Sequence, residues 1–491
     1  MISFPHPIAV AVAETGEPSY PREPPFDPPE HYPELHTEVW HLDPANRVYA
    51  GVREALRLLG FDTEWYGTPH WNPLSALVRP GDRVVIKPNL VRHFHGDGLR
   101  LDALITHGSV VRAVLDYVIL ALKGRGDITI GDSPLQYADF PTAVEGSGLA
   151  RVVEDARRYA GVEIRLVDFR RTRSEKRGGI IMTRLPNDGD PGGYRVVDLK
   201  GGSRFAGLEE SRTRRFRVTQ YDPRAMRQAH NAVNHAYLFP AAILRADVVI
   251  NIPKLKTHRK AGVTAAMKNL VGINGSKDWL PHHTMGPVSS GGDEYLRPSL
   301  RKEIISRLRD GIEGRRGAMA RRALHLVERG VRATGRLMPF PDPYWEGSWH
   351  GNDTVWRMVH DLHRVLFHAD ATGLLREEPQ RRYLALVDAV IAGEGEGPMR
   401  PTPKGAGLII AGENPAAVDI VCARVMGFDE GKIPLLRNAI GGGFHPDLPS
   451  RDHIEVLTNA GRWRHPFDLL RAQTLSFTPP AGWAGAIELD T

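Results

Sequence analysis

Two short apolar runs, Val84-Val-Ile-Lys-Pro-Asn and Asp127-Ile-Thr-Ile-Gly-Asp, decide the fold that the sequence predicts. Both have the length of short buried strands. The segment between them, Val110 to Lys123, is typical of a helix, and Ser109 just before it is the expected N-cap. A strand, a helix and a second strand at this spacing predict a parallel pair with a right-handed crossover.

Polar residues stand at the ends of these two strands. Lys87 and Asn89 end the first strand, and Asp132 and Ser133 end the second. The carboxyl ends of parallel strands open on the same edge of a sheet, and open α/β sheets hold their ligands at that edge. The sequence therefore predicts that these residues lie together at a binding edge.

The same alternation of strands and helices continues along the chain. It predicts an α/β fold with a largely parallel sheet, βαβ units, two closely packed lobes and a helical insertion. We divide the chain into a proline-rich N-terminal segment (1–45), an α/β core that carries the site (46–283), a mainly helical basic insertion (284–380) and a C-terminal α/β part that completes the site (381–491).

Composition excludes several classes of protein. The one cysteine, Cys422, excludes a disulfide framework and an iron–sulfur cluster within this chain, and its apolar neighbours predict a buried residue. Residues 301–336 carry eleven Lys or Arg residues and four acids, a net charge of +7, so the overall +6 does not indicate a nucleic-acid-binding surface. No signal peptide and no apolar run of about 20 residues is visible, so the expected location is the cytoplasm.

The chemistry is expected in the Lys- and His-rich stretch from Lys254 to His283. Lys254, Lys256, His258 and Lys268 lie within fifteen residues, directly after a strand that should be buried. Clustered cationic donors suit a carboxylate or phosphate ligand. Crowded ammonium groups also lower one another's pKa, which makes a lysine a usable base or nucleophile.

Other residues of this stretch are assigned by their neighbours. We interpret Arg259 and Lys260 as solvated loop charges. His282 and His283 are adjacent and cannot easily share one metal on regular structure, so we expect at most one of them to be functional. The candidate catalytic residues are Lys268, His258, His283 and His282.

Supporting groups complete the predicted site. The candidate substrate-binding residues are Lys87, Asn89, His107, Lys254, Lys256 and Asn269. His107 precedes a helix N-terminus, where it binds an anion or simply caps the helix. Asp132, Glu394 and Glu396 are candidate metal ligands or general bases. The two glutamates stand between glycines, in a loop that we expect at the end of a short strand, Leu384 to Ile391. The acids of Gly393-Glu-Gly-Glu-Gly would repel phosphate, so this run is not a phosphate-binding loop, and no dinucleotide motif stands between a strand and a helix.

Several longer motifs resemble one family in the same order along the chain. They are Val85-Ile-Lys-Pro-Asn-Leu-Val, Ile128-Thr-Ile-Gly-Asp-Ser-Pro, Ala246-Asp-Val-Val-Ile-Asn-Ile-Pro-Lys-Leu-Lys-Thr-His, Met267-Lys-Asn-Leu-Val-Gly and Val387-Asp-Ala-Val-Ile-Ala-Gly-Glu-Gly-Glu-Gly-Pro. The chain resembles the uncharacterised proteins grouped as domain of unknown function 362. That resemblance implies no activity. Some members carry ferredoxin-like cysteine clusters, which this chain lacks, so no redox role is implied.

The central stretch is also remotely similar to the nickel-pincer lactate racemases. The matching positions are His258, Gly262, Lys268 and either His282 or His283. This resemblance implies that the lysine tethers a pincer cofactor and that the histidines serve the metal and proton transfer. The racemases' Thr-His-Arg after the second strand is replaced here by Gly131-Asp-Ser-Pro, so a nickel-pincer cofactor is one possibility and magnesium is another.

We therefore expect an enzyme that acts on a small anionic substrate such as a hydroxy acid, a sugar acid or a phosphorylated metabolite. Proton transfer by Lys and His in a racemase, epimerase or lyase reaction suits this set of residues best. The first alternative is a magnesium-dependent transferase with a phosphorylated or nucleotide-sugar donor. The second is a non-enzymatic anion-binding or peripheral membrane protein, because the helix in 315–336 has one apolar stripe among arginines. A helix packed on the body with its arginines in water is the preferred interpretation of that stripe.

Overall fold

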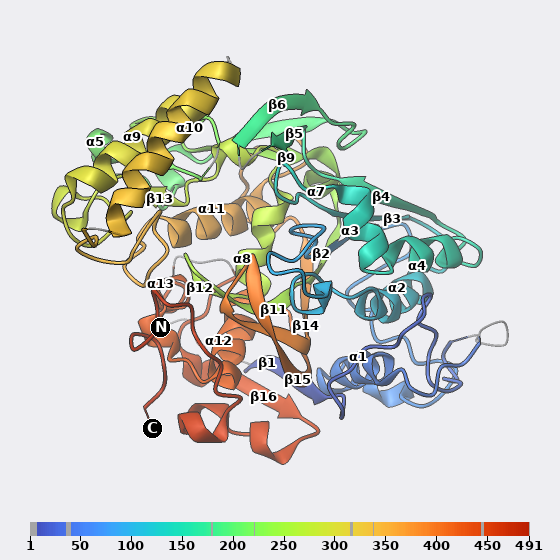
Figure 1. Cartoon of the computed structure of the whole chain (residues 1–491). Helices are drawn as coiled ribbons and strands as arrows, with labels where there is room; N and C mark the ends of the chain where they lie inside the picture. The colour runs from blue at the N-terminus through green and yellow to red at the C-terminus, as the bar shows by residue number, and fades with distance from the viewer. Residues whose placement is uncertain are drawn as a thin grey trace.

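The computed structural model describes residues 7–35, 41–177, 180–219, 221–314, 318–336, 338–442 and 446–490. Ten strands of this part of the chain form one sheet (Figure 1). Its main path runs in the order β16 (Ile454–Thr458), β1 (Ile8–Glu14), β15 (Arg400–Gly412), β14 (Arg382–Glu396), β10 (Val248–Ile252), β2 (Arg83–Pro88), β3 (Asp127–Asp132) and β4 (Glu163–Asp168). Two further strands, β11 (Lys254–His258) and β12 (Gly262–Thr264), join the sheet beside β14.

The sheet is largely parallel, as predicted. Strands β14, β10, β2, β3 and β4 are all parallel to their neighbours in this order, and β11 is parallel to β14. The antiparallel pairs are β1 with β15, β14 with β15, and β11 with β12. Helix α2 (Gly108–Leu122) connects β2 to β3, so the predicted strand–helix–strand unit is confirmed.

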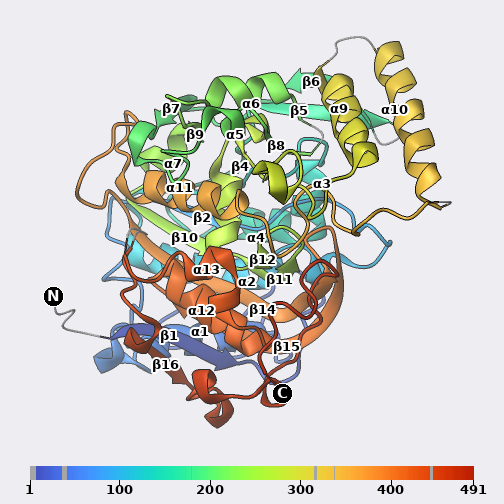
Figure 2. The ribbon, with the colours of Figure 1, turned by 90° about the vertical axis from the view of Figure 1, so that its left-hand side faces the viewer.

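Helices cover both faces of the sheet, and each face has its own apolar core (Figures 1 and 2). The first core contains residues of α1 (Arg47–Leu58), α2, α3 (Phe140–Gly146) and α4 (Leu149–Ala156). The second core contains residues of α6 (Pro223–Ala229), α7 (Ala241–Arg245), α8 (Ala266–Asn269), α11 (Val355–His368), α12 (Pro415–Met426) and α13 (Pro434–Arg437). Strand residues alternate between the cores: Val84 and Ile86 belong to the first, Val85 to the second. One sheet runs through both, so the expectation of two lobes is not confirmed.

Three short pairs of strands lie outside the main sheet, and residues 210–213 form a further short helix. The pairs are β5 (Thr172–Arg177) with β6 (Ile180–Pro186), β7 (Tyr194–Asp198) with β9 (Ala236–Pro240), and β8 (Phe216–Arg217) with β13 (His283–Thr284). The helix is α5 (Glu210–Thr213).

The helical segment between the core strands contains α9 (Leu300–Gly314), α10 (Ala318–Ala333) and α11. Helices α9 and α10 lie side by side at the edge of the molecule in both views (Figures 1 and 2). The apolar stripe that suggested the membrane alternative is only partly exposed, because Val327 is 52% exposed whereas Ala320, Leu324 and Val331 are half-buried. Residues 315–317 of the proposed membrane segment lie outside the described residues. None of the described helices is both long and apolar enough to cross a membrane.

Two local predictions were wrong. The N-cap of α2 is His107, whose Nδ1 accepts a hydrogen bond from the Ser109 backbone N–H, and not Ser109 itself. The run Gly393 to Gly397 was expected to be a loop at the end of a short strand. Most of it instead continues β14, which pairs with β15 as far as Glu396 opposite Arg400. The prediction of a buried Cys422 is confirmed.

Candidate active site

A cavity of about 140 Å³ lies at the carboxyl ends of β2 and β3, bounded by β11, β12, α8 and the segment that follows α8. We call it the inner cavity. The polar residues that line it are Asn89, Asp132, Ser133, Lys256, His258, Thr264, Lys268, Asn269, Lys277 and His282. The structure thus brings together the predicted sheet edge and the predicted Lys/His stretch.

Three lysines line the inner cavity without a carboxylate partner among the described residues. Lys256 Nζ donates to Asn89 Oδ1 over 2.9 Å, and Lys277 Nζ donates to the Val271 carbonyl over 3.2 Å. Burial and, to a smaller extent, the charges of Lys277 and Lys260 together lower the pKa of Lys268 to about 7. Burial likewise lowers the pKa of Lys277 to about 7 and the pKa of Lys256 well below its usual value. Burial thus disfavours the charged form of each lysine, and an anionic ligand bound among them would favour their protonated forms.

The two histidines of the inner cavity have opposite tautomers, assigned from their hydrogen-bond partners. His258 Nδ1 accepts backbone N–H groups of Lys260 (3.0 Å) and Ala261 (3.2 Å), so the proton of the neutral ring is on Nε2. His282 Nδ1 lies 2.8 Å from the Leu280 carbonyl oxygen, which can only accept, so its Nε2 carries a lone pair. Burial and the charge of Lys268 lower the pKa of both rings well below the usual value, which keeps them neutral. His258 can donate a hydrogen bond from Nε2, and His282 can accept a proton at Nε2.

A buried ion pair forms part of the floor of the inner cavity. Lys87 Nζ lies 2.7 Å from Asp132 Oδ1, and both side chains are buried. The Asp132 carboxylate also accepts the backbone N–H groups of Leu90 (2.7 Å) and Ser133 (2.8 Å). Asn269 Oδ1 accepts from Lys87 Nζ over 3.1 Å and from Asn89 over 2.8 Å. The ion pair and its amides hold the lining residues in place.

Gly272 packs directly on this ion pair. A Cβ at this position would lie 1.9 Å from Asp132 Oδ1 and 2.6 Å from Lys87 Nζ. We expect Gly272→Ala to lower the free energy of unfolding by about 1–3 kcal/mol or more, because the buried pair must separate. Urea unfolding followed by tryptophan fluorescence measures this. Gly461→Ala is the control, since its Cβ would contact nothing within 4 Å. A Gly272→Ala protein as stable as the wild type would contradict the close approach.

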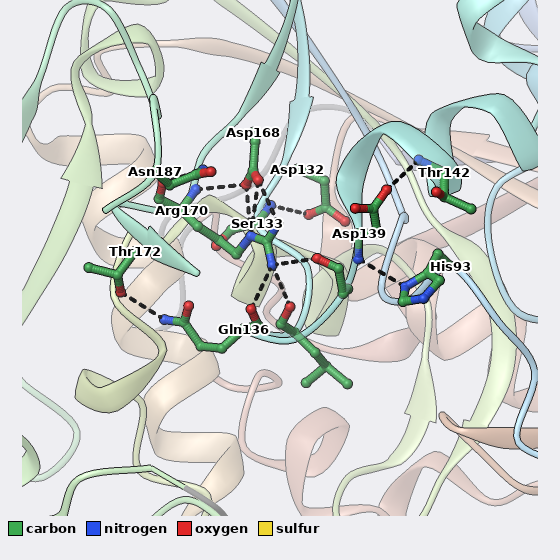
Figure 3. Close-up of polar contacts among 12 residues, drawn as sticks. His93, Asp132, Ser133, Gln136, Asp139, Thr142, Asp168, Arg170, Thr172 and Asn187 are labelled. Carbon is green, nitrogen blue, oxygen red and sulfur yellow. Dashed lines mark hydrogen bonds and ion pairs between the residues drawn. The ribbon is translucent and has the colours of Figure 1, made fainter. Parts of the chain in front are cut away.

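The loop after β3, which bounds the cavity through Ser133 and Leu135, is fastened by Arg170 (Figure 3). The buried Arg170 guanidinium pairs with Asp168 at 2.6 Å. It also donates to the carbonyls of Leu135 (2.7 Å), Gln136 (3.1 Å) and Ala138 (2.9 Å). Because one rigid group satisfies three loop carbonyls, the wall of the inner cavity is fixed before a ligand enters.

Two predicted ligand residues, Lys254 and His107, lie away from the inner cavity. Lys254 Nζ lies 2.6 Å from Asp388 Oδ2, and Tyr20 OH donates to Asp388 Oδ1 over 2.5 Å. The His107 ring stacks on Tyr20 at 4.0 Å, and its backbone N–H donates to Asp388 over 3.0 Å. This buried group, which we call the Asp388 cluster, joins the N-terminal segment to the sheet.

The structure does not bring Glu394 and Glu396 to Asp132. Glu394 accepts the backbone N–H of Thr478 over 2.9 Å, and Glu396 accepts that of Ala481 over 2.8 Å. Both carboxylates therefore fasten the C-terminal segment to β14.

The neighbouring His283 and Lys260 face away from the inner cavity. His283 lines a separate cavity beside α9, and its Nδ1 lies 3.4 Å from Lys260 Nζ. Lys260 is half-buried and lines an adjoining cleft, so its interpretation as a solvated charge is wrong.

Two residues of the site were missed in the sequence. Lys277 lies within the Lys/His stretch, but the residues around it form no pattern that marks it as a site residue. Asp419 of α12 accepts the backbone N–H groups of Ala266 (2.6 Å) and Met267 (3.0 Å), which fixes the start of α8 and thereby Lys268 and Asn269. Burial raises the pKa of Asp419 to about 8. The signal was an isolated acid in the apolar run Val418-Asp-Ile-Val-Cys-Ala.

Comparison with protein families gives one match. The family model described as Domain of unknown function (DUF362) matches residues 84–182 and 202–424. The chain belongs to this family. The match spans the inner cavity and confirms that resemblance, whereas the remote resemblance to lactate racemases is not shown. No curated protein is significantly similar to the chain.

The donor atoms of the inner cavity can be compared with the two metal groups that the sequence suggested. Magnesium prefers oxygen ligands, but Asp132 supplies the one carboxylate of the lining and is already paired with Lys87. These residues do not fit magnesium. Lys268 and the imidazoles of His258 and His282 do meet in one cavity, so they fit the tether and ligands of a nickel-pincer group. That cofactor stays a prediction.

Proposed function

We propose that the protein is an enzyme that binds a small anion in the inner cavity and moves a proton at the carbon next to it, as a racemase, epimerase or lyase does. The observation that carries the proposal is that His258 and His282, whose hydrogen bonds assign them opposite tautomers, line one cavity with Lys268, which has no carboxylate partner among the described residues. Proton abstraction needs a base and a hydrogen-bond donor for the negative charge that forms, and His282 and His258 supply these two groups.

The chemistry follows from these groups. Lys256, Lys268 and Lys277 hold the carboxylate of the substrate, and the bound anion favours their protonated forms. His282 Nε2 takes the proton from the adjacent carbon, and the electron pair of the broken C–H bond moves into the carboxylate. The ammonium groups and His258 Nε2–H stabilise the resulting enediolate. For the stereoisomer, the Lys268 ammonium donates a proton to the other face, His282 gives its proton to solvent, and solvent reprotonates Lys268. For elimination, a neighbouring leaving group departs with its bonding electron pair.

Hydrogen exchange with solvent tests this proposal. The protein is incubated in D2O with a panel of hydroxy acids, sugar acids and phosphorylated acids. We expect it to introduce deuterium at the carbon next to the carboxylate of its substrate, and ¹H NMR measures the loss of that proton signal. His282→Gln should slow exchange by about 10²-fold or more, because the base is lost. His283→Gln is the matched control, since that ring faces the other cavity and exchange should persist. An exchange rate that His282→Gln leaves unchanged would contradict the assignment of His282 as the base.

A further inference from the structure

The inner cavity adjoins a larger cleft of about 650 Å³, which we call the outer cleft. Both share the same wall, made of Leu135, Val218, Tyr221, His258, His282, Pro398 and Met399. The two histidines therefore stand at the junction of the two spaces. A ligand held in the inner cavity has room to continue into the outer cleft.

The shared wall is mostly apolar. Apart from the two imidazoles it consists of Leu135, Val218, Tyr221, Pro398 and Met399. The Tyr221 hydroxyl lies 3.5 Å from the Gln136 backbone nitrogen, which donates to it. The part of Tyr221 that can contact a ligand is therefore mainly its ring. Apolar walls favour a short hydrocarbon or ring-shaped segment of the ligand at this level.

Beyond this apolar wall, the outer cleft is lined by cationic side chains, among them Lys260 and Arg92. Lys260 Nζ has only neutral hydrogen-bond partners among the described residues, Thr219 Oγ1 at 3.3 Å and His283 Nδ1 at 3.4 Å. Arg92 donates to the carbonyls of Phe94 (2.7 Å) and Met399 (2.8 Å) and forms no ion pair within the described part of the chain.

The other cations of the outer cleft have loose or internal partners. Arg259 lies 3.9 Å from Glu396, and Arg400 lies 3.6 Å from Asp97. Arg309 is paired with Glu328 and with Glu346, which also lines the cleft. The outer cleft thus holds its own unneutralised positive charge, centred on Lys260 and Arg92.

We propose that the substrate carries two anionic groups joined by a short apolar or ring-shaped spacer, and that Lys260 and Arg92 bind the second group in the outer cleft. This inference rests on the proposed function, because it takes the first anion to be held beside Lys268. The second group is a carboxylate or a phosphate, since Lys and Arg bind either.

Isothermal titration at pH 6.5 with simple probes tests the second subsite. Straight-chain α,ω-dicarboxylates of increasing length are compared with monocarboxylates of the same length, and ω-phosphonocarboxylates distinguish phosphate from carboxylate. At the length that spans both spaces, the dianion should bind about tenfold tighter or more than the matched monoanion.

Single substitutions test which residues cause the tighter binding of the dianion. Lys260→Gln should bring the ratio of the two dissociation constants close to one, and Arg259→Gln, on the rim of the same cleft, should reduce it. Lys432→Gln is the control, because it removes an exposed lysine outside both spaces and should keep the ratio. Dianions that bind no tighter than monoanions in the wild type would overturn the second subsite and leave the proposed function standing. Failure of both kinds of anion to bind would overturn the two together.

Discussion

Lys254→Met is expected to lower the free energy of unfolding by about 3–5 kcal/mol, although Lys254 does not face the inner cavity. The side chains of Lys254 and Asp388 are both 0% exposed and lie 2.6 Å apart. Removing the ammonium leaves a buried carboxylate whose remaining partners are the Tyr20 hydroxyl and the backbone N–H groups of His107 and, at 3.4 Å, Val390. An uncompensated buried charge costs more than the loss of the contact itself.

Urea unfolding at pH 7 measures the effect. The double variant Lys254→Met/Asp388→Leu is the matched control, because it removes both charges and should recover a large part of the lost stability. Because Tyr20 anchors the N-terminal segment to this cluster, the single variant should also be cleaved faster by protease within residues 14–35. A single variant that unfolds like the wild type would contradict the buried pair.

The binding edge could be predicted from sequence because it depends on local pattern. The strands that end at Lys87 and Asp132 were visible as apolar runs, and the helix between them imposed a parallel pair. That topology alone places the two residues side by side, and they form an ion pair of 2.7 Å. Lys268 was predicted to point into a site because apolar residues surround it, and it lines the inner cavity.

The different surroundings of Lys254 and Lys256 could not be predicted, because they depend on a shift in the pairing register between β11 and β14. Lys254 and Lys256 are two residues apart on β11, and regular alternation would give them the same surroundings. The register with β14 shifts between them, from Asp388 opposite Lys254 to Gly393 opposite Lys256. Lys254 therefore meets an acid while Lys256 meets the amide of Asn89.

The acids of β14 illustrate a second limit. Glu394 and Glu396 looked like ligands because glycines surround them at the expected end of a strand. Their partners are backbone N–H groups of Thr478 and Ala481, more than eighty residues further along the chain. Local spacing carries no signal for such long-range hydrogen bonds.

Lys268→Met is expected to have the opposite effect on stability from Lys254→Met, because Lys268 has no carboxylate partner within the described residues. Its pKa falls from an unfolded value of 10.5 to about 7 in the folded protein. Between pH 7 and 10.5 the unfolded state binds more protons, so wild-type stability rises with pH across this window and is lowest below pH 7. Each pKa unit corresponds to about 1.4 kcal/mol, so a fall of about 3.5 pKa units corresponds to roughly 5 kcal/mol, and the variant, which lacks this charge, should be more stable than the wild type by up to about that amount at pH 6.5.

The same substitution should weaken anion binding, because the ammonium that costs stability is the group that holds the ligand. Loss of one charge-assisted hydrogen bond, about 1.5–3 kcal/mol, corresponds to an affinity roughly 10- to 100-fold lower for a monocarboxylate at pH 6.5. Urea unfolding at pH 6.5 and pH 9.5, with titration calorimetry on the same samples, measures both effects. The gain in stability should shrink at pH 9.5, where the wild-type lysine is neutral in the folded state. A variant that is less stable and binds anions normally would show that Lys268 is a structural residue, since a site lysine gives up stability in the free protein for affinity in the complex.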